Sequence, residues 1–246
     1  MTKQIIKFDE YELRARVFPA VIVTLPAVVT AYTFIRSLRS LGGIAGGAII
    51  ESAFLFLLAR IARDRGKRIQ DRLYTKWGGK PTTAMLRHSD QRLDPFTKDR
   101  YKRTLAKSVA ESFPTQQEES ADPRRADQIY DSAVRALIEK RRGKTYRLVF
   151  AENCNFGFIR NVLGLKPIGL CISALGFGVG TVLVWHHAAE IPNPLYIPLA
   201  VSIGVALLLL MVTEGSARRT AEAYAEALLR TCESSQRART TTTATD

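Results

Sequence analysis

The chain has 246 residues and a formal net charge of +13, from 36 basic and 23 acidic side chains. Its three cysteines form no CxxC pair, which argues against a disulfide framework and a cysteine-based zinc site. No HExxH, GxSxG or Walker motif is present, so we expect no enzymatic activity, no cofactor and no bound metal. Uncharged apolar runs alternate with densely charged segments, a pattern typical of a membrane protein that carries a soluble domain.

The first sixty residues predict a membrane hairpin. Residues 1–16 interleave apolar and charged side chains, which predicts an amphipathic segment at the membrane interface or against the soluble domain. Residues 17–35 carry no charge and form the first predicted span, in which Pro26 is expected to kink the helix. Residues 41–58 are apolar except for one carboxylate and reach the length of a second span. The first transmembrane hairpin therefore occupies residues 17–59.

The carboxylate in this second run is Glu51, and Gly43, Gly47 and Glu51 are spaced four apart, so a helix places them on one face. A charged group at mid-membrane costs about 2.5–3.5 kcal/mol, so Glu51 is expected to face protein or water. One interpretation is an uncharged or paired glutamate that holds the helices together. The other makes Glu51, Gly43 and Gly47 residues that line or gate a pore.

Residues 60–166 predict a small, helical, basic domain, because they contain 25 of the basic and 13 of the acidic side chains. Helices are expected over residues 95–109 and 123–141, with a polar loop over residues 113–125. The positive bias of cytoplasmic loops explains much of this charge, but a nucleotide, an oligonucleotide or an anionic lipid also suits it. The GGKPTT segment at residues 78–83 is either a purely structural turn or a loop that binds a ligand. The candidate ligand-binding cations are Lys80, Arg87, Lys98, Arg100, Lys102 and Arg103.

The segment ENCNFGFIRN, residues 152–161, is the least generic part of the basic domain. Its asparagines and glycine favour a turn. One interpretation is a buried ion pair between Glu152 and Arg160. The other is a loop that reads a nucleotide by aromatic stacking, with Asn155, Phe156 and Arg160 as candidate contacts.

A second hairpin is predicted over residues 167–212, with spans at 167–185 and 194–212. Gly169, Ser173, Gly176 and Gly180 form a small-residue face for close helix packing in the first of these spans. A cytosolic helix over residues 213–236 and a disordered tail over residues 237–246 are expected to follow. The predicted fold is an all-α integral membrane protein with four transmembrane helices in two hairpins that flank the basic domain. The positive-inside rule places that domain and both termini in the cytoplasm.

This layout, with GGKPTT and ENCNFGFIRN as its distinctive pieces, resembles over roughly the whole chain the four-helix membrane effectors of Hailong-type bacterial anti-phage defence. The resemblance implies a homo-oligomeric channel in the bacterial inner membrane, a nucleotide-type signal that opens or closes it, and a nucleotidyltransferase partner. It assigns no site residue. The alternatives are a membrane-anchored scaffold, whose basic domain recruits a partner or anionic lipid, and a small transporter.

Overall fold

The computed structural model describes residues 9–35, 41–109, 112–187 and 196–242, without the side chains of residues 41–45, 49, 51, 108 and 234–242. Every regular element in these ranges is a helix, so the predicted all-α class is confirmed. Two compact units divide the chain: unit 1 comprises residues 1–71 and 154–217, and unit 2 comprises residues 72–153 and 218–246. Three long helices contain the points of division: α3 (Leu41–Lys76), α8 (Arg147–His187) and α10 (Glu214–Thr242).

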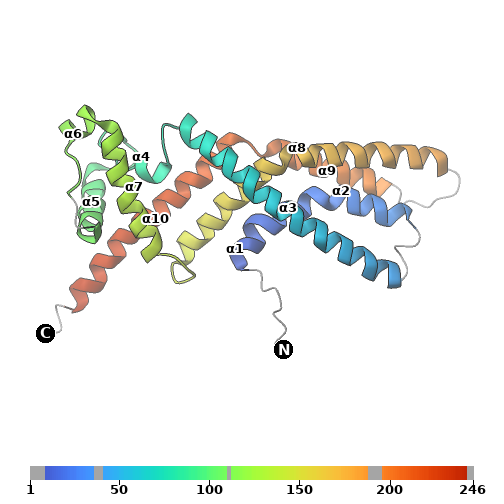
Figure 1. Cartoon of the computed structure of the whole chain (residues 1–246), viewed down its shortest axis with the longest axis horizontal. Coiled ribbons are helices and arrows are strands. Elements are labelled where there is room, and N and C mark those ends of the chain that lie inside the picture. The colour runs from blue at the N-terminus through green and yellow to red at the C-terminus, as the bar shows by residue number, and fades with distance from the viewer. Residues whose placement is uncertain (1–8, 36–40, 110–111, 188–195, 243–246) are drawn as a thin grey trace. The chain divides into compact units, whose positions relative to one another are not determined.

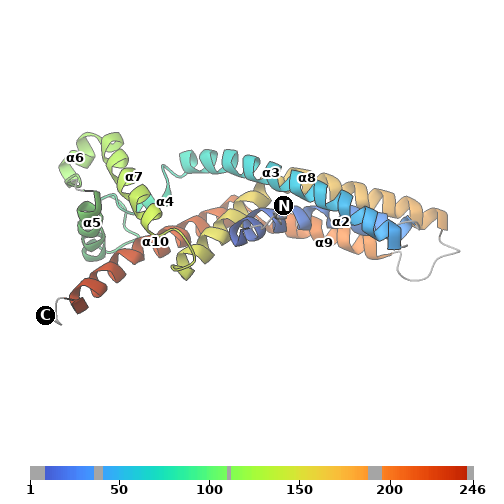
Figure 2. The same ribbon diagram turned by 60° about the horizontal axis from the view of Figure 1, so that its bottom comes forward.

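Unit 1 contains α1 (Glu10–Glu12), the π-helical turn η1 (Leu13–Val17), α2 (Phe18–Phe34), α9 (Tyr196–Met211) and its parts of the long helices. In both views α2, α9, the first half of α3 and the second half of α8 lie along one another (Figure 1 and Figure 2). Their shared apolar core is contributed by four helices. The buried core residues are Ala20, Val23, Leu58, Ala62, Val162, Leu165, Val205 and Leu209.

The small-residue face of α8 lies in the interior of unit 1, as its spacing predicts. A Cβ on Gly169 would lie 2.5 Å from Leu209 Cδ1, and a Cβ on Gly180 would lie 2.9 Å from Leu199 Cδ2. Only glycine permits so close an approach of the two helices. Gly169 contacts Leu209 whereas Gly180, later in α8, contacts Leu199, which is earlier in α9. The two helices are therefore antiparallel.

Two helical stretches, Glu10–Phe34 and Arg147–His186, are long and apolar enough to cross a membrane, counting only the described residues. They contain the predicted first and third spans. The predicted fourth span corresponds to α9. This helix is long and apolar enough to cross a membrane only when it is counted together with α10, and the pair is bent by 61°. Lys166 Nζ donates to Leu210 O and Val212 O at this bend, and Thr213 Oγ1 accepts from Ser216 N at 3.3 Å. The predicted second span lies in α3, where several side chains are outside the described set.

Unit 2 is built from α4 (Pro81–Ala84), α5 (Pro95–Val109), α6 (Gln116–Ala121), α7 (Pro123–Lys140) and its parts of the long helices. Its core gathers Tyr130, Leu105, Leu137 and Leu228 from three helices. The helices predicted over residues 95–109 and 123–141 are confirmed.

Two predicted irregular segments of unit 2 contain helix instead. The loop expected over residues 113–125 contains α6. This helix forms because Thr115 accepts from Glu118 N while the Glu118 carboxylate accepts from Thr115 N, a capping box. The sequence predicts a disordered tail from residue 237, but α10 extends to Thr242, and residues 243–246 lie outside the described residues.

Candidate functional site

The pore candidates Gly43, Gly47 and Glu51 all lie in the first half of α3. The surroundings of Gly43 and the side chain of Glu51 are outside the described set, and Gly47 is partly exposed. No described atom lies within 4 Å of the position that a Cβ would take on the neighbouring Gly46. Ile50 is 72% exposed. This part of α3 therefore carries small and apolar residues that face away from the described core of unit 1.

Among the described residues of unit 1, the basic residues that bound the apolar stretches and two exposed aromatic residues lie at opposite ends of the bundle. Arg16, Arg60 and Lys166 bound the apolar stretches at the end where Ala20, Leu58 and Leu165 meet in the core. Trp185, 84% exposed, and the exposed Tyr196 lie at the other end, just beyond the contact of Gly180 with α9. Residues 167–185 span about 28 Å as a helix, close to the hydrocarbon thickness of about 30 Å. The bundle thus has the charge and aromatic distribution of a membrane-spanning unit.

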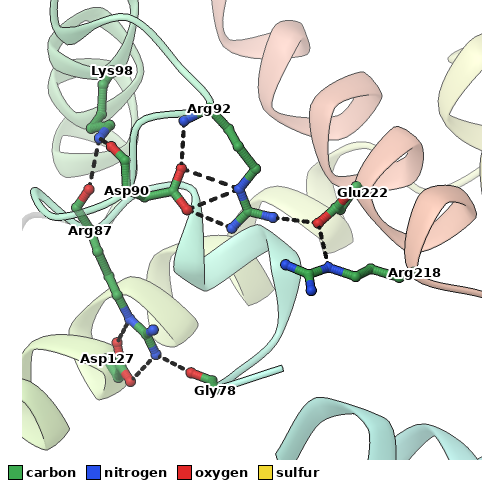
Figure 3. A network of polar contacts seen from close by, with 8 residues as sticks. All are labelled: Gly78, Arg87, Asp90, Arg92, Lys98, Asp127, Arg218 and Glu222. Atoms are coloured by element: carbon green, nitrogen blue, oxygen red, sulfur yellow. Dashed lines mark hydrogen bonds and ion pairs between the residues drawn. The ribbon is translucent and has the colours of Figure 1, made fainter. Parts of the chain in front are cut away.

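Two of the predicted ligand cations of unit 2 pair with carboxylates of α7. The Lys80 ammonium contacts Asp131, which also accepts from the Thr83 hydroxyl. Arg87 donates to Asp127 Oδ1 at 2.8 Å and Oδ2 at 2.6 Å, as Figure 3 shows. The hydrogen bond and the charge of Asp127 raise the pKa of Arg87 despite its partial burial. These two pairs hold the segment around α4 against α7.

A second set of polar contacts holds the loop between α4 and α5 (Figure 3). Arg92 donates to both oxygens of Asp90 and, at 2.8 Å, to Glu222 of α10. The Lys98 ammonium donates to Arg87 O at 2.8 Å and also contacts Asp90 O. Lys98 is only 5% exposed, so this candidate ligand-binding cation is engaged inside unit 2. Its ammonium donates to two backbone carbonyls inside the loop, and an apolar residue in its place would remove these hydrogen bonds.

The most unusual feature of unit 2 is a buried cluster formed by His88, Lys102, Glu119 and Tyr130. Lys102, another candidate ligand-binding cation, is only 7% exposed. Its ammonium lies 2.8 Å from His88 Nε2 and donates to the Tyr130 hydroxyl at 3.2 Å. The Tyr130 hydroxyl in turn donates to Glu119 at 2.7 Å, and Glu119 accepts the His88 backbone N–H at 2.9 Å. A hydrogen-bonded chain therefore runs from Lys102 to the carboxylate.

The electrostatics of the cluster follow from this burial. Burial lowers the pKa of Lys102 to about 8, although the charge of Glu119 opposes the shift. Burial acts to raise the pKa of Glu119, but the hydrogen bonds from His88 N and the Tyr130 hydroxyl leave it below the usual value. Burial and the bond to Glu119 raise the pKa of Tyr130.

The His88 ring has two competing neighbours. Its Nε2 lies 3.0 Å from Pro114 O and 2.8 Å from Lys102 Nζ. A protonated Nε2 can donate to the carbonyl, whereas a bare Nε2 can accept from the ammonium, and the single nitrogen cannot do both. The hydrogen bonds of this cluster thus depend on where its protons lie. Sequence reasoning missed Glu119 and Tyr130, although Tyr130 lies at helical spacing from the apolar Ala126, Ala133 and Val134.

The remaining predicted cations of α5 lie nearer to solvent. Arg100 is partly exposed and pairs with Glu233 at 3.2 Å. Arg103 is exposed and donates only to the backbone oxygen of Asp99, at 3.3 Å. Phe96, 78% exposed, precedes Arg100 by about one turn of the same helix. This face of α5 is the part of the predicted ligand site that is open to a ligand.

The ENCNFGFIRN segment forms no turn, because it lies inside α8. Glu152 and Arg160 are separated by about 12 Å along that helix, so the predicted ion pair does not form. Arg160 is buried; it contacts Gln70 Oε1 and lies 5.6 Å from the centroid of the buried Phe156 ring. Asn155 is exposed on the helix surface. The three candidate contacts therefore do not form one ligand site.

The same segment instead makes a close crossing of helices in unit 1. The fully buried Asn161 donates through Nδ2 to Ala15 O in the π-helical turn at 2.5 Å. A Cβ on Gly66 of α3 would lie 2.1 Å from Asn161 Oδ1, and one on Gly164 would lie 2.8 Å from Gly66 N. Asn161, one of the asparagines that suggested a turn, is thus a packing residue, and with Gly66 and Gly164 it brings η1, α3 and α8 together.

No group of three metal-ligating side chains lies together in the described part of the chain. No protein-family model matches the sequence, and neither a curated protein nor a solved structure matches it. Function must therefore be argued from the two units themselves.

Proposed function

We propose that this chain is a multi-pass protein of the bacterial inner membrane that assembles into a homo-oligomeric ion channel. In this proposal four transmembrane helices form two hairpins, in residues 17–59 and 167–212. Unit 2 and both termini lie in the cytoplasm. A nucleotide-type ligand, made by a nucleotidyltransferase partner, controls the pore. A role in anti-phage defence is supported by the resemblance of layout.

The distribution of charge along unit 1 supports the membrane part of the proposal. The uncharged stretches of α2 and α8 begin beside Arg16 and Lys166. Exposed aromatic residues mark the far end of the bundle, including Trp185 and Tyr196. Basic residues are retained on the cytoplasmic side of membranes, and tryptophan and tyrosine favour the interface. This polarity supports a cytoplasmic unit 2.

The observation that carries the channel proposal is the contrast between the glycines of α8 and α3. Gly169 and Gly180 of α8 contact α9 of the same chain, whereas Gly46 of α3 contacts no described atom outside its own helix. Small residues promote association in lipid when another helix approaches them closely. Since α2, α8 and α9 fill the interior of their own bundle, the glycine-rich face of α3 suits a second copy. Glu51, one turn after Gly47, would then form part of a ring.

The exposed face of α5 supports the ligand part of the proposal. Phe96 offers an aromatic surface, and Arg100 and Arg103 follow it one and two turns later. Aromatic side chains stack on bases while neighbouring cations contact phosphates, which is a common mode of nucleotide and single-strand binding. Among the predicted ligand cations of α5, Arg100 and Arg103 are the ones whose side chains are not buried.

The experiment compares the wild-type chain with Glu51→Gln, after reconstitution of the purified full chain into vesicles. A ring of carboxylates raises the local concentration of cations. We therefore expect cation flux from the wild type, and a lower flux or a weaker cation preference from Glu51→Gln with an unchanged oligomer. Glu139→Gln, an exposed carboxylate of α7, is the matched control and keeps the wild-type flux. A wild-type monomer in detergent, or identical flux from all three chains, contradicts the proposal.

The internal pairing of Lys80 and Arg87 favours a second candidate function, because cations that are already paired are poor sites for a diffusible ligand. In this alternative the chain is a membrane-anchored scaffold that recruits a partner or anionic lipid through unit 2. A scaffold inserts into the membrane without conducting ions. The same flux measurement therefore separates the two functions.

A further inference from the structure

Within the described part of the chain, several cations of α3 lack carboxylate partners such as those of the cations around α4 in unit 2. In unit 2, Lys80, Arg87 and Arg92 each pair with a carboxylate. In α3, four cations make no side-chain ion pair or hydrogen bond within the described part of the chain: Arg60, Arg63, Lys67 and Arg68. The Nε atom of Arg63 is buried and still without a partner. Residues 60–68 hold five cations and one carboxylate, so they attract an anion that the chain itself does not supply.

The unpaired cations lie along one side of the helix. Leu58 and Ala62 face the core of unit 1. Arg60, Arg63 and Lys67 fall within about 60° of one another on a helical projection, on the side opposite to this packed face. The three residues therefore form a stripe on the side of α3 away from the core, with Arg60 and Lys67 exposed and Arg63 partly buried.

An exposed apolar surface precedes the stripe on the same side of α3. Phe56 and Leu57 are exposed, and on a helical projection they fall on the side of Arg60. Arg60 and Arg63 follow Leu58 by about 3 Å and 7.5 Å along the helix axis. A phospholipid headgroup layer is about 5–7 Å thick beyond the hydrocarbon. A phosphate with an attached apolar chain matches this order of apolar and then basic residues along α3 better than a free nucleotide does.

We propose that Arg60, Arg63 and Lys67 bind the phosphate of an anionic phospholipid in the cytoplasmic leaflet, while Phe56 and Leu57 contact its acyl chains. Guanidinium groups bind phosphate oxygens in a bidentate manner, and the long flexible side chain of Lys67 allows its ammonium to extend back to the headgroup. The site rests on the proposed membrane insertion of unit 1. It does not require the channel.

The test titrates the full chain in neutral detergent with phosphatidylglycerol or phosphatidylcholine and counts bound lipid by native mass spectrometry. The variant combines Arg60→Gln, Arg63→Gln and Lys67→Gln. The matched control removes three exposed cations of unit 2 instead: Arg124→Gln, Arg125→Gln and Arg135→Gln. A second variant, Arg60→Lys with Arg63→Lys, keeps the charge and guards against misfolding.

A basic side chain near an anionic surface contributes about fivefold in affinity, so loss of three weakens phosphatidylglycerol binding about a hundredfold. We expect this loss only in the glutamine variant of α3, with a smaller change in the lysine variant and none in the control. Equal binding of the two lipids, or equal loss in the control, overturns the site. Displacement of the lipid by equimolar water-soluble glycerol phosphate also overturns it, because phosphate alone would then be the ligand. Failure of the chain to insert into neutral vesicles overturns the proposed function and the site with it.

Discussion

Substitution of the buried Lys102 by methionine tests the electrostatics of unit 2. Methionine keeps the length and apolar stem of lysine but removes the ammonium. The groups that face this ammonium are the His88 ring, the Tyr130 hydroxyl and, through it, Glu119, with charges of Lys98 and Asp99 nearby. Because burial disfavours the charged form, the folded chain binds the Lys102 proton less tightly than the unfolded chain does.

The size and sign of the effect follow from the two pKa values. The pKa of Lys102 falls from 10.5 to about 8 on folding. Each pKa unit corresponds to 1.36 kcal/mol, so the charged ammonium lowers the free energy of unfolding by about 3 kcal/mol below pH 8. This penalty fades as the pH rises from 8 to 10.5, because the unfolded state then binds more protons than the folded state. Between pH 7.5 and pH 9.5 the wild type therefore gains about 2 kcal/mol relative to Lys102→Met.

The assay is denaturant unfolding of the full chain in detergent, followed by Trp77 fluorescence in a Trp185→Phe background, so that the signal reports on unit 2. Lys107→Met, at an exposed position of the same helix, is the matched control. Its free energy of unfolding is expected to run parallel to that of the wild type at every pH. If the curve of Lys102→Met also runs parallel to the wild type, the burial argument for Lys102 is wrong.

Two further substitutions test the buried carboxylate and the helix crossing. Glu119→Gln is expected to lower the free energy of unfolding of unit 2 by about 2 kcal/mol, since it weakens hydrogen bonds to a charged group. Glu139→Gln, on the surface, is the control and is expected to change this free energy by less than about 0.5 kcal/mol. Equal effects of the two substitutions in the Trp77 assay contradict the prediction. Gly164→Ala is expected to destabilise unit 1 by about 1–3 kcal/mol, because its Cβ would lie 2.8 Å from Gly66 N. Gly178→Ala, at an open position of α8, is the control, and equal melting temperatures in detergent would disprove the crossing.

Local patterns predicted much of the helical architecture. The start of α7 follows from Pro123 at a favoured first-turn position, with Asp122 accepting from Arg125 N as its cap. The face of α8 with Gly169 and Gly180 follows from three- and four-residue spacing alone. The capping box of Thr115 and Glu118 was also readable from the sequence and would have predicted α6. Such signals involve residues within one turn of each other.

The buried polar contacts could not be predicted in the same way. Lys98 and Lys102 lie at helical spacing with Tyr101 and Leu105, so all four share the inward face of α5. Lysine is almost never buried without a partner, and the partners of these two lysines are not evident from the sequence. Those partners come from other parts of unit 2, such as the loop before α5 and, through Tyr130, α7. The tertiary fold brings these partners to α5, and residue spacing within α5 does not predict it.

Net charge alone is therefore a poor guide to where this protein meets an anion. An anion that bound Arg87 would have to separate it from Asp127, leaving a partly buried carboxylate without its guanidinium partner and detaching the segment around α4 from α7. An anion that bound Arg60 or Lys67 would break no contact of the described chain. Since binding competes with any pairing that it must disrupt, the stripe of α3 is favoured over the internally paired cations of unit 2.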